Sequence, residues 1–538
     1  MNDNQMEVLV NEIFDWYFKT HPLMATRLGR HEYDHRLPDY SPAGIAGRLK
    51  GATIYRRRLE QLDAQGLNLE QRVDLKVLWM EMNKIVRQHQ RIRLYTKNPG
   101  ALSSSIMGIA YLMLVRDYAP LSSRLENLTC RLQGAPGLLK EQRRLIDNPP
   151  PIYTRLAITQ TAAGLNYFKA LKPMIRERMG GPREDFERAL KETVAAFEEH
   201  LKWLQELSSK SGGDFAVGEQ IFNQLLTEDY LLDYDADSLL EKGWSLFNES
   251  REQLHALSHE INPKLKPSQL LKELRAEHPP AEELLSCYRS YMERARDFIQ
   301  KEDLVDLPPG ERLLVEETPT FFRAILPFAA YMSPAPFEKE ALGRFWVTPA
   351  EDDEGLGAHS IYKLPVTTVH EAYPGHHLQL CTAQRVSSKA RLLSYCPLFS
   401  EGWAFYCEEL MEEKGFLQEP EIRLMRLKDQ LWRAARIILD VALHTHRISV
   451  PQAVSFLVER VGLGRTQAAA EVGRYTLTPT QPMSYLIGKL EILKLARDYR
   501  LHQGEDFQLK TFHQRLLSCG TIPPALAREL LFSAADQE

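Results

Sequence analysis

Apolar residues recur at steps of three and four along most of the chain, as in residues 6–17, 75–82 and 190–204. This spacing places them on one face of a helix. The helical pattern is interrupted where prolines and glycines gather, at residues 148–151, 210–213, 278–280 and 307–310. The sequence therefore predicts a mostly α protein.

The domain organisation follows from the same pattern. We expect an N-terminal helical region over residues 1–340 and a C-terminal helical region over residues 341–538. None of the breaks is long enough to be a clear linker, so one continuous domain over residues 1–538 is the alternative.

One region departs from the helical period. Residues 343–349 and 360–364 are short and rich in β-prone side chains, and an acidic turn at residues 351–355 separates them. They predict a small β-hairpin just ahead of residue 370.

The richest chemistry lies at residues 370–377, His-Glu-Ala-Tyr-Pro-Gly-His-His. Neutral imidazole and carboxylate suit Zn²⁺, and catalytic zinc sites usually take three protein ligands. In the H-E-x-x-H motif, two histidines four residues apart bind zinc and the glutamate acts as general base. By this analogy His370 is a ligand and Glu371 is the base, but Pro374 stands where the second histidine is expected.

The second histidine ligand is therefore His376 or His377. On an ideal helix His377 shares the face of His370, but it lies about 10 Å further along the axis. Pro374 would collide with the carbonyl of His370 and disturb the helix. A bulge over residues 373–375 would bring His376 to the metal instead. This argument favours His376 and keeps His377 as the alternative.

A further carboxylate, Glu401, lies in the apolar stretch Ser-Glu-Gly-Trp-Ala-Phe-Tyr at residues 400–406. An unpaired charge is costly to bury. Glu401 is either a helix N-terminal acid after Ser400 as cap, or a ligand, and the two roles are compatible. With the histidine cluster it is typical of a zinc hydrolase.

The segments from His370 to Gln379 and from Glu401 to Glu408 resemble the bacterial domain-of-unknown-function family 885, with its His-Glu-x-x-Pro-Gly-His-His signature. That family is similar to the all-helical zinc metallopeptidases of the thimet oligopeptidase, angiotensin-converting enzyme and thermostable carboxypeptidase type. Weaker similarity extends to residues 22–34, 482–490 and 512–523.

The resemblance implies a helical metallopeptidase-like fold, in which residues 1–340 form one wall of a cleft and residues 341–538 are the catalytic region with the zinc site. It places the hairpin at the rim of that cleft, where its edge could pair with an extended peptide by strand addition. It also implies one Zn²⁺ per chain, held by His370, His376 and Glu401, with Glu371 as the general base. A peptide or small amide is the implied substrate.

Several other polar residues are candidates for roles near the metal. Tyr485 and Tyr475 could each stabilise an oxyanion, because a phenol is a neutral donor, or either could be an ordinary core tyrosine. Tyr485 matches the family segment better. Arg474 either binds a substrate carboxylate or is an ordinary surface arginine.

Three further residues have two readings each. Glu408, two helical turns after Glu401, is a surface charge or a partner of a ligand. Asp440 and His444 lie four residues apart in an apolar run. They form a satisfied pair, or one of them reaches the cleft or stands behind a ligand histidine.

Composition excludes some classes of function. A net charge of −5 and a pI near 6.4 give no basic footprint for nucleic acid. The densest apolar run, residues 106–115, is far shorter than the ~20 residues of a membrane span. The first seven residues carry acids where a secretory signal has basic residues, and the six cysteines lack paired spacing. These features predict a cytoplasmic protein with reduced thiols.

Together these observations predict a zinc-dependent hydrolase, most simply a metallopeptidase in which Glu371 activates a water. A helical scaffold with a structural metal and a metal-dependent hydrolase of a non-peptide bond are the alternatives. Substrate length, the end of the substrate that is cleaved and the oligomeric state have no signature in the sequence.

Overall fold

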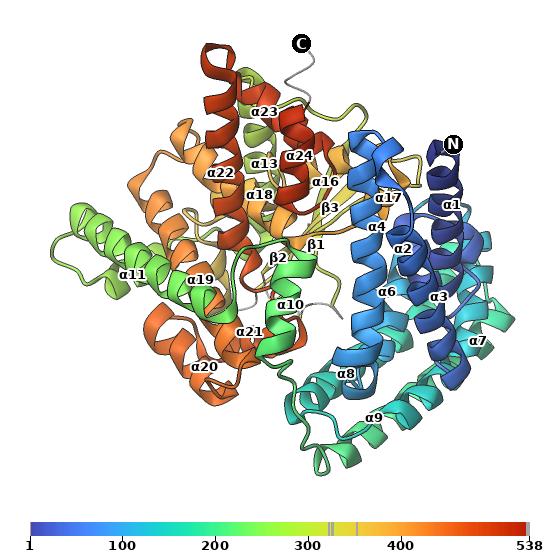
Figure 1. The fold of residues 1–538 in the computed structure, drawn as a ribbon. Coiled ribbons are helices and arrows are strands. Elements are labelled where there is room, and N and C mark those ends of the chain that lie inside the picture. The colour runs from blue at the N-terminus through green and yellow to red at the C-terminus, as the bar shows by residue number, and fades with distance from the viewer. Residues whose placement is uncertain (1, 321–322, 324–325, 327, 351–352, 534–538) are drawn as a thin grey trace. The chain divides into compact units, whose positions relative to one another are not determined.

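The computed structural model describes residues 2–320, 323, 326, 328–350 and 353–533, and helices dominate it (Figure 1). The prediction of a mostly α protein is confirmed. The described residues group into two compact units. Unit 1 is formed mainly by residues 2–215, with residues 335–340, and unit 2 by residues 216–319, 328–334 and 341–533.

This division differs from the predicted boundary at residue 340, because residues 216–319 group with the C-terminal part of the chain. Helix α11 (Ala236–Ile261) packs against α19 (Pro420–His444). At their contact, a Cβ on Gly243 would lie 3.0 Å from a side-chain carbon of Ile437. Packing between segments far apart in the sequence therefore extends unit 2 toward the N-terminus.

Unit 1 contains a core in which the apolar faces of the helices over residues 101–208 meet and the rings of Phe168 and Phe197 lie 5.0 Å apart. Its helices are α1 (Asn2–Thr20), α2 (Pro22–Leu28), α3 (Pro42–Glu60), α4 (Leu69–Arg87), α5 (Leu94–Lys97), α6 (Ala101–Val115), α7 (Leu121–Leu145), α8 (Pro151–Met179) and α9 (Glu184–Ser208).

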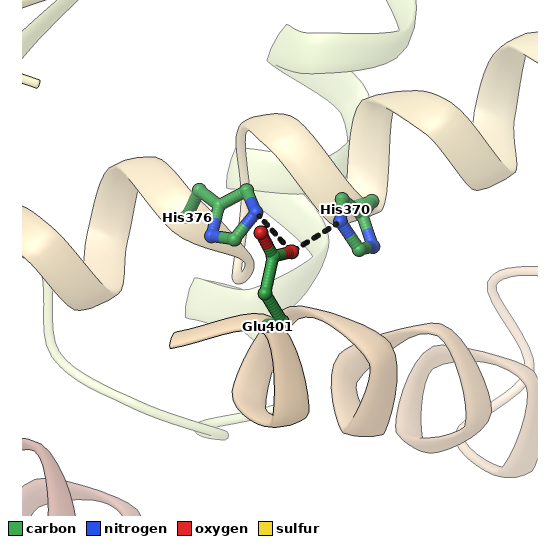
Figure 2. Close-up of side chains that lie close together, drawn as sticks. All are labelled: His370, His376 and Glu401. Carbon is green, nitrogen blue, oxygen red and sulfur yellow. Dashed lines mark ion pairs between the residues drawn. The ribbon is translucent and has the colours of Figure 1, made fainter. Parts of the chain in front are cut away.

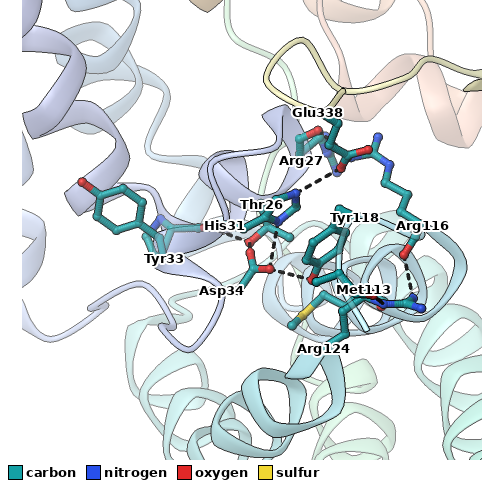
Figure 3. A network of polar contacts seen from close by, with 12 residues as sticks. Thr26, Arg27, His31, Tyr33, Asp34, Met113, Arg116, Tyr118, Arg124 and Glu338 are labelled. Atoms are coloured by element: carbon teal, nitrogen blue, oxygen red, sulfur yellow. Dashed lines mark hydrogen bonds and ion pairs between the residues drawn. The ribbon is translucent and has the colours of Figure 1, made fainter. Parts of the chain in front are cut away.

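The N-terminal segment that resembles the family, residues 22–34, forms a buried polar network in unit 1 (Figure 3). The carboxylate of Asp34 accepts hydrogen bonds from the Thr26 hydroxyl at 2.5 Å and the Tyr118 hydroxyl at 2.6 Å, and lies 2.9 Å from Nδ1 of His31. Burial alone would raise the pKa of Asp34, but these three partners hold it below its usual value. The segment therefore has a structural role within unit 1.

Unit 2 carries the remaining elements. Its helices are α10 (Glu219–Asp229), α11, α12 (Pro267–Ala276), α13 (Leu284–Lys301), α14 (Asp353–Leu356), α15 (Leu364–Glu371), α16 (His376–Ala383), α17 (Lys389–Leu393), α18 (Pro397–Glu413), α19, α20 (Val450–Phe456), α21 (Arg465–Leu477), α22 (Ser484–Gln503), α23 (Leu509–Ser518) and α24 (Pro524–Ser533). Its strands are β1 (Arg312–Glu317), β2 (Ala329–Met332) and β3 (Leu342–Val347).

The three strands form a sheet in the order β1-β3-β2. Strand β3 pairs in parallel with β1, where Arg312 lies opposite Leu342, and antiparallel with β2, where Ala329 lies opposite Val347. The first strand of the predicted hairpin is therefore present as β3, but its partners come from earlier in the chain.

The second predicted strand, residues 360–364, is wrong. Residues 361–363 form a turn, and the backbone N–H groups of Lys363 and Leu364 donate to the carbonyl of Ser360. Pro365 stands in the first turn of α15, where a missing N–H costs nothing and the ring favours the start of a helix. Two residues of the predicted acidic turn, 351 and 352, lie outside the described part of the chain.

Helices α18 and α22 cross in close contact, and this crossing positions the site. A Cβ on Gly402 of α18 would lie 2.4 Å from the backbone carbon of Gly488 on α22. A Cβ on Gly488 would lie 2.0 Å from the carbonyl oxygen of Leu398. The two glycines let the backbones approach, so Glu401 on α18 comes near Tyr485 on α22.

Candidate metal centre

The helix that carries His370 ends and restarts between the two histidine positions. Helix α15 ends at Glu371 and α16 begins at His376. The N–H of Gly375 donates to the carbonyl of Val369 at 3.0 Å. A Cβ on Gly375 would lie 2.0 Å from the carbonyl oxygen of His370, so only glycine fits this turn. The predicted bulge is in fact a complete break of the helix.

The break brings His376 beside His370, and α18 adds Glu401 (Figure 2). One ligand atom from each of the three residues lies within 4.8 Å of the others. Oε2 of Glu401 is 3.7 Å from Nε2 of His370 and 3.3 Å from Nε2 of His376. The two imidazole rings are nearly perpendicular, with centroids 4.8 Å apart. These are three of the residues that the sequence singled out.

The far nitrogen of His370 is held by Glu408. Nδ1 of His370 lies 2.8 Å from Oε1 of Glu408, which is buried and not a surface charge. With Nδ1 directed at this carboxylate, Nε2 is the nitrogen of His370 that faces Glu401. Burial alone would lower the pKa of His370, but the hydrogen bonds with Glu401 and Glu408 raise it to about 9. The surroundings of His370 therefore favour a positive charge.

Nδ1 of His376, the nitrogen that faces away from Glu401, contacts a chain of hydrogen-bonded neutral side chains. Nδ1 of His376 lies 3.4 Å from the hydroxyl of Ser400. That hydroxyl donates to the amide oxygen of Gln379 at 3.2 Å, and the Gln379 amide nitrogen donates to the Thr521 hydroxyl at 3.0 Å. Because the Ser400 hydroxyl donates its proton to Gln379, its oxygen can accept a hydrogen bond from Nδ1 of His376. Nε2 of His376 again faces Glu401.

Ser400 is not the cap of its helix. Helix α18 begins at Pro397, after Cys396, so Ser400 lies inside the first turn and turns its hydroxyl toward α16. Glu401 is nearly buried, which alone would raise the pKa of its carboxyl. The charge of His376 and hydrogen bonds with His370 and His376 hold that pKa well below its usual value.

His377 points into a different environment. Its Nε2 lies 2.5 Å from Oε2 of Glu311, and its Nδ1 lies 2.9 Å from the hydroxyl of Tyr331 on β2. The Tyr373 hydroxyl also donates to Oε2 of Glu311, at 2.6 Å. Both ring nitrogens of His377 are thus engaged, and of the two adjacent histidines only His376 joins the cluster with His370.

The two candidate tyrosines, Tyr485 and Tyr475, also lie in different environments. The Tyr485 ring stacks beside His370 with centroids 6.3 Å apart. Burial and the charge of Glu401 raise the pKa of Tyr485, so its phenol keeps its proton and can donate. The hydroxyl of Tyr475, by contrast, accepts hydrogen bonds from Trp432 and Arg436, both at 3.1 Å. The structure therefore brings Tyr485, and not Tyr475, to the cluster.

Glu371 stands at the last position of α15 and is half-buried. Within the described part of the chain its carboxylate has no side-chain hydrogen-bond partner. Its charge contributes to the raised pKa of the neighbouring His370. Glu371 is thus close to the cluster and its carboxylate is not engaged.

Asp440 and His444 bind different segments. The carboxylate of Asp440 accepts from the backbone N–H groups of Thr480 at 3.0 Å and Met483 at 3.2 Å. Nε2 of His444 lies 3.0 Å from the carbonyl oxygen of Tyr475. Asp440 therefore fixes the segment that leads into α22, and does not stand behind a ligand histidine.

Sequence reasoning missed the roles of Ser400, Gln379 and Gln481. Gln379 ends the first segment that resembles the family and Ser400 directly precedes the second, but nothing in the spacing showed that they meet. Gln481 lies just before the family segment that contains Tyr485. Its amide nitrogen is 3.4 Å from Oε1 of Glu401.

The residues present fit a zinc ion. Two imidazole nitrogens and one carboxylate oxygen form the donor set of many catalytic zinc sites. Both histidines have their far nitrogens engaged, which fixes the orientation of the rings.

Two solved structures have the same fold as this chain. A protein described as "a putative lipoprotein of unknown function" from Shewanella oneidensis is 24% identical, with a TM-score of 0.80 over 98% of this chain and 99% of that one. A "putative lipoprotein" from Colwellia psychrerythraea is 19% identical, with a TM-score of 0.85 over the full length of both chains. No curated protein matches the sequence.

These neighbours contradict the predicted cytoplasmic location, since both are described as lipoproteins. That prediction relied on the acidic first residues and the scattered cysteines, neither of which determines location. No helix in the described ranges combines the length and the apolar character that crossing a membrane requires.

The family resemblance seen in the sequence is confirmed along almost the whole chain. The match extends over residues 22–531, and so includes the polar network of unit 1 as well as the histidine cluster of unit 2. The chain belongs to the family described as bacterial protein of unknown function, DUF885.

Proposed function

We propose that this protein is a zinc-dependent hydrolase, and specifically a metallopeptidase that cleaves peptide or small amide bonds. One observation carries the proposal: the ligand atoms of His370, His376 and Glu401 converge within 4.8 Å. Three protein ligands of these types leave a coordination position for water, as catalytic zinc sites require.

The metal, when bound, supplies Lewis acidity and lowers the pKa of a water molecule to about 7. Glu371 would take the proton from that water; in support, it directly follows His370 and has no hydrogen-bond partner among the described side chains. It would later return the proton to the leaving amine. The Tyr485 hydroxyl, which keeps its proton, would donate a hydrogen bond to the developing oxyanion.

The decisive variant is Glu371→Gln, which keeps the shape of the side chain and removes the proton acceptor. We expect it to retain zinc and the fold, and to lose at least the roughly 10²- to 10⁴-fold typical of general-base catalysis. The measurement is zinc content together with cleavage of a peptide mixture, followed by mass spectrometry of new termini. Glu413→Gln, at the exposed end of α18, is the matched control and should behave as wild type.

The possible results separate the alternatives. A wild-type protein that takes up no zinc contradicts the proposal. Loss of zinc in Glu371→Gln would make Glu371 a ligand, and activity within a few-fold of wild type would refute its role as base. Stoichiometric zinc without cleavage of any amide substrate would favour a structural metal or a hydrolase of another bond.

A further inference from the structure

Gln481 connects two residues of the candidate site. It lies between α21 and α22, and its amide nitrogen is 3.4 Å from Oε1 of Glu401 and 3.4 Å from the hydroxyl of Tyr485. The other oxygen of Glu401, Oε2, is the one that faces both imidazoles. The two oxygens of this carboxylate therefore have different partners.

The orientation of the Gln481 amide is fixed from behind by an arginine. The Arg474 guanidinium donates to the amide oxygen of Gln481 at 2.7 Å and to Oε2 of Glu471 at 3.0 Å. A guanidinium can only donate, so the amide oxygen must face Arg474 and the amide nitrogen must face Glu401. Arg474 therefore has structural partners within unit 2 and is not an ordinary surface arginine.

The backbone of Gln481 is also held. Asp440 accepts hydrogen bonds from the N–H groups on either side, those of Thr480 and Met483. The carbonyl of Gln481 accepts from the Ser484 hydroxyl at 2.6 Å. A side chain on such an anchored segment can hold its partner in one position.

We infer that Gln481 is a positioning residue that engages Oε1 of Glu401 and so leaves Oε2 as the single carboxylate oxygen presented to the metal. The same amide keeps the Tyr485 hydroxyl beside the carboxylate. This inference rests on the proposed zinc function. It predicts that Glu401 binds zinc through one oxygen, because the second is already occupied.

The test uses Gln481→Met, which has a similar length and cannot donate. We expect zinc affinity, measured by competition with a chelator, to fall by roughly 10- to 100-fold, the usual effect of losing an outer partner of a ligand. X-ray absorption at the zinc edge should show one Glu401 oxygen in the wild type and two in the variant. Gln142→Met, in the core of unit 1, is the control for the loss of a buried glutamine and should leave zinc affinity unchanged.

Arg474→Met provides a second route, since it removes the group that orients the amide. It should weaken zinc binding in the same direction, and the double variant should be no weaker than Gln481→Met alone. Unchanged zinc affinity in Gln481→Met, or the same carboxylate coordination in both proteins, would overturn the inference and leave the proposed function intact. A wild-type protein that binds no zinc would overturn both.

Discussion

His376 and His377 are adjacent in the sequence, yet their side chains face different parts of unit 2. Nε2 of His376 lies 3.3 Å from Glu401, whereas both nitrogens of His377 are occupied by Glu311 and Tyr331. Successive residues on a helix point about 100° apart. A shift of one residue along α16 therefore separates the imidazole that can be a ligand, His376, from the imidazole that anchors α16 to the sheet, His377.

Replacing each histidine by alanine tests this division. His376→Ala should retain the fold and lose zinc affinity by more than the roughly 10- to 100-fold expected for an outer partner. His377→Ala should keep zinc affinity near that of the wild type, and lose about 1–3 kcal/mol of stability because the buried Glu311 loses one of its hydrogen-bond partners and keeps the Tyr373 hydroxyl and the ion pair with Arg296. Chelator competition and urea unfolding measure the two effects. The opposite pattern would show that α15 and α16 form one continuous helix in solution.

At the scale of elements, the sequence predicted the helices well because their apolar spacing is local information. Pro374 also predicted a disturbed helix, because its clash with the His370 carbonyl depends only on local sequence. The partners of β3 could not be predicted in this way. Strand pairing depends on which distant segments meet, and β1 and β2 come from residues 312–317 and 329–332, where the pattern gave no comparable signal.

In the candidate site, too, local features could be predicted from the sequence and tertiary contacts could not. His370, Glu371, His376 and Glu401 could be named from the sequence because they stand in specific motifs, and Tyr485 because it stands in a weaker family segment. The partners that orient them could not, because those contacts form only where α16, α18 and the segment before α22 pack together. Residue chemistry is visible in a motif, whereas hydrogen-bond partners depend on tertiary structure.

The crossing of α18 and α22 is the element-scale feature that holds the site together. Gly488→Ala would place a Cβ 2.0 Å from the Leu398 carbonyl oxygen and 2.8 Å from Cα of Gly402, so the two backbones must separate. We expect a loss of about 1–3 kcal/mol from overpacking. We also expect weaker zinc binding, because Glu401 follows α18.

The matched control is Gly108→Ala on α6, where an added Cβ meets nothing within 4 Å. This change should stabilise the protein by about 0.5–1 kcal/mol, because alanine is the better helix former. Thermal unfolding and chelator competition on the two variants measure both effects. Equal behaviour of the two alanines would mean that the close approach of α18 and α22 is not needed.

At the scale of the whole molecule, the three ligand residues all come from unit 2, on α15, α16 and α18. A ligand that binds only the folded state stabilises it by mass action, by about 4 kcal/mol when its free concentration is a thousand times its dissociation constant. That free energy opposes local unfolding of the helices that carry the ligand residues, because such unfolding would separate those residues. Removal of zinc should therefore affect the two units unequally.

We expect hydrogen exchange, measured by mass spectrometry on the full-length protein, to slow in α15, α16 and the first turns of α18 when zinc is bound. Exchange in α6–α9, whose side chains form the separate core of unit 1, should change little between the zinc-loaded and chelator-treated states. His376→Ala should abolish the difference, because it lacks a ligand. Protection by zinc that appears in α6–α9 and not in α15 and α16 would place the metal elsewhere, and exchange that is identical in both states would mean that the cluster of His370, His376 and Glu401 holds no metal.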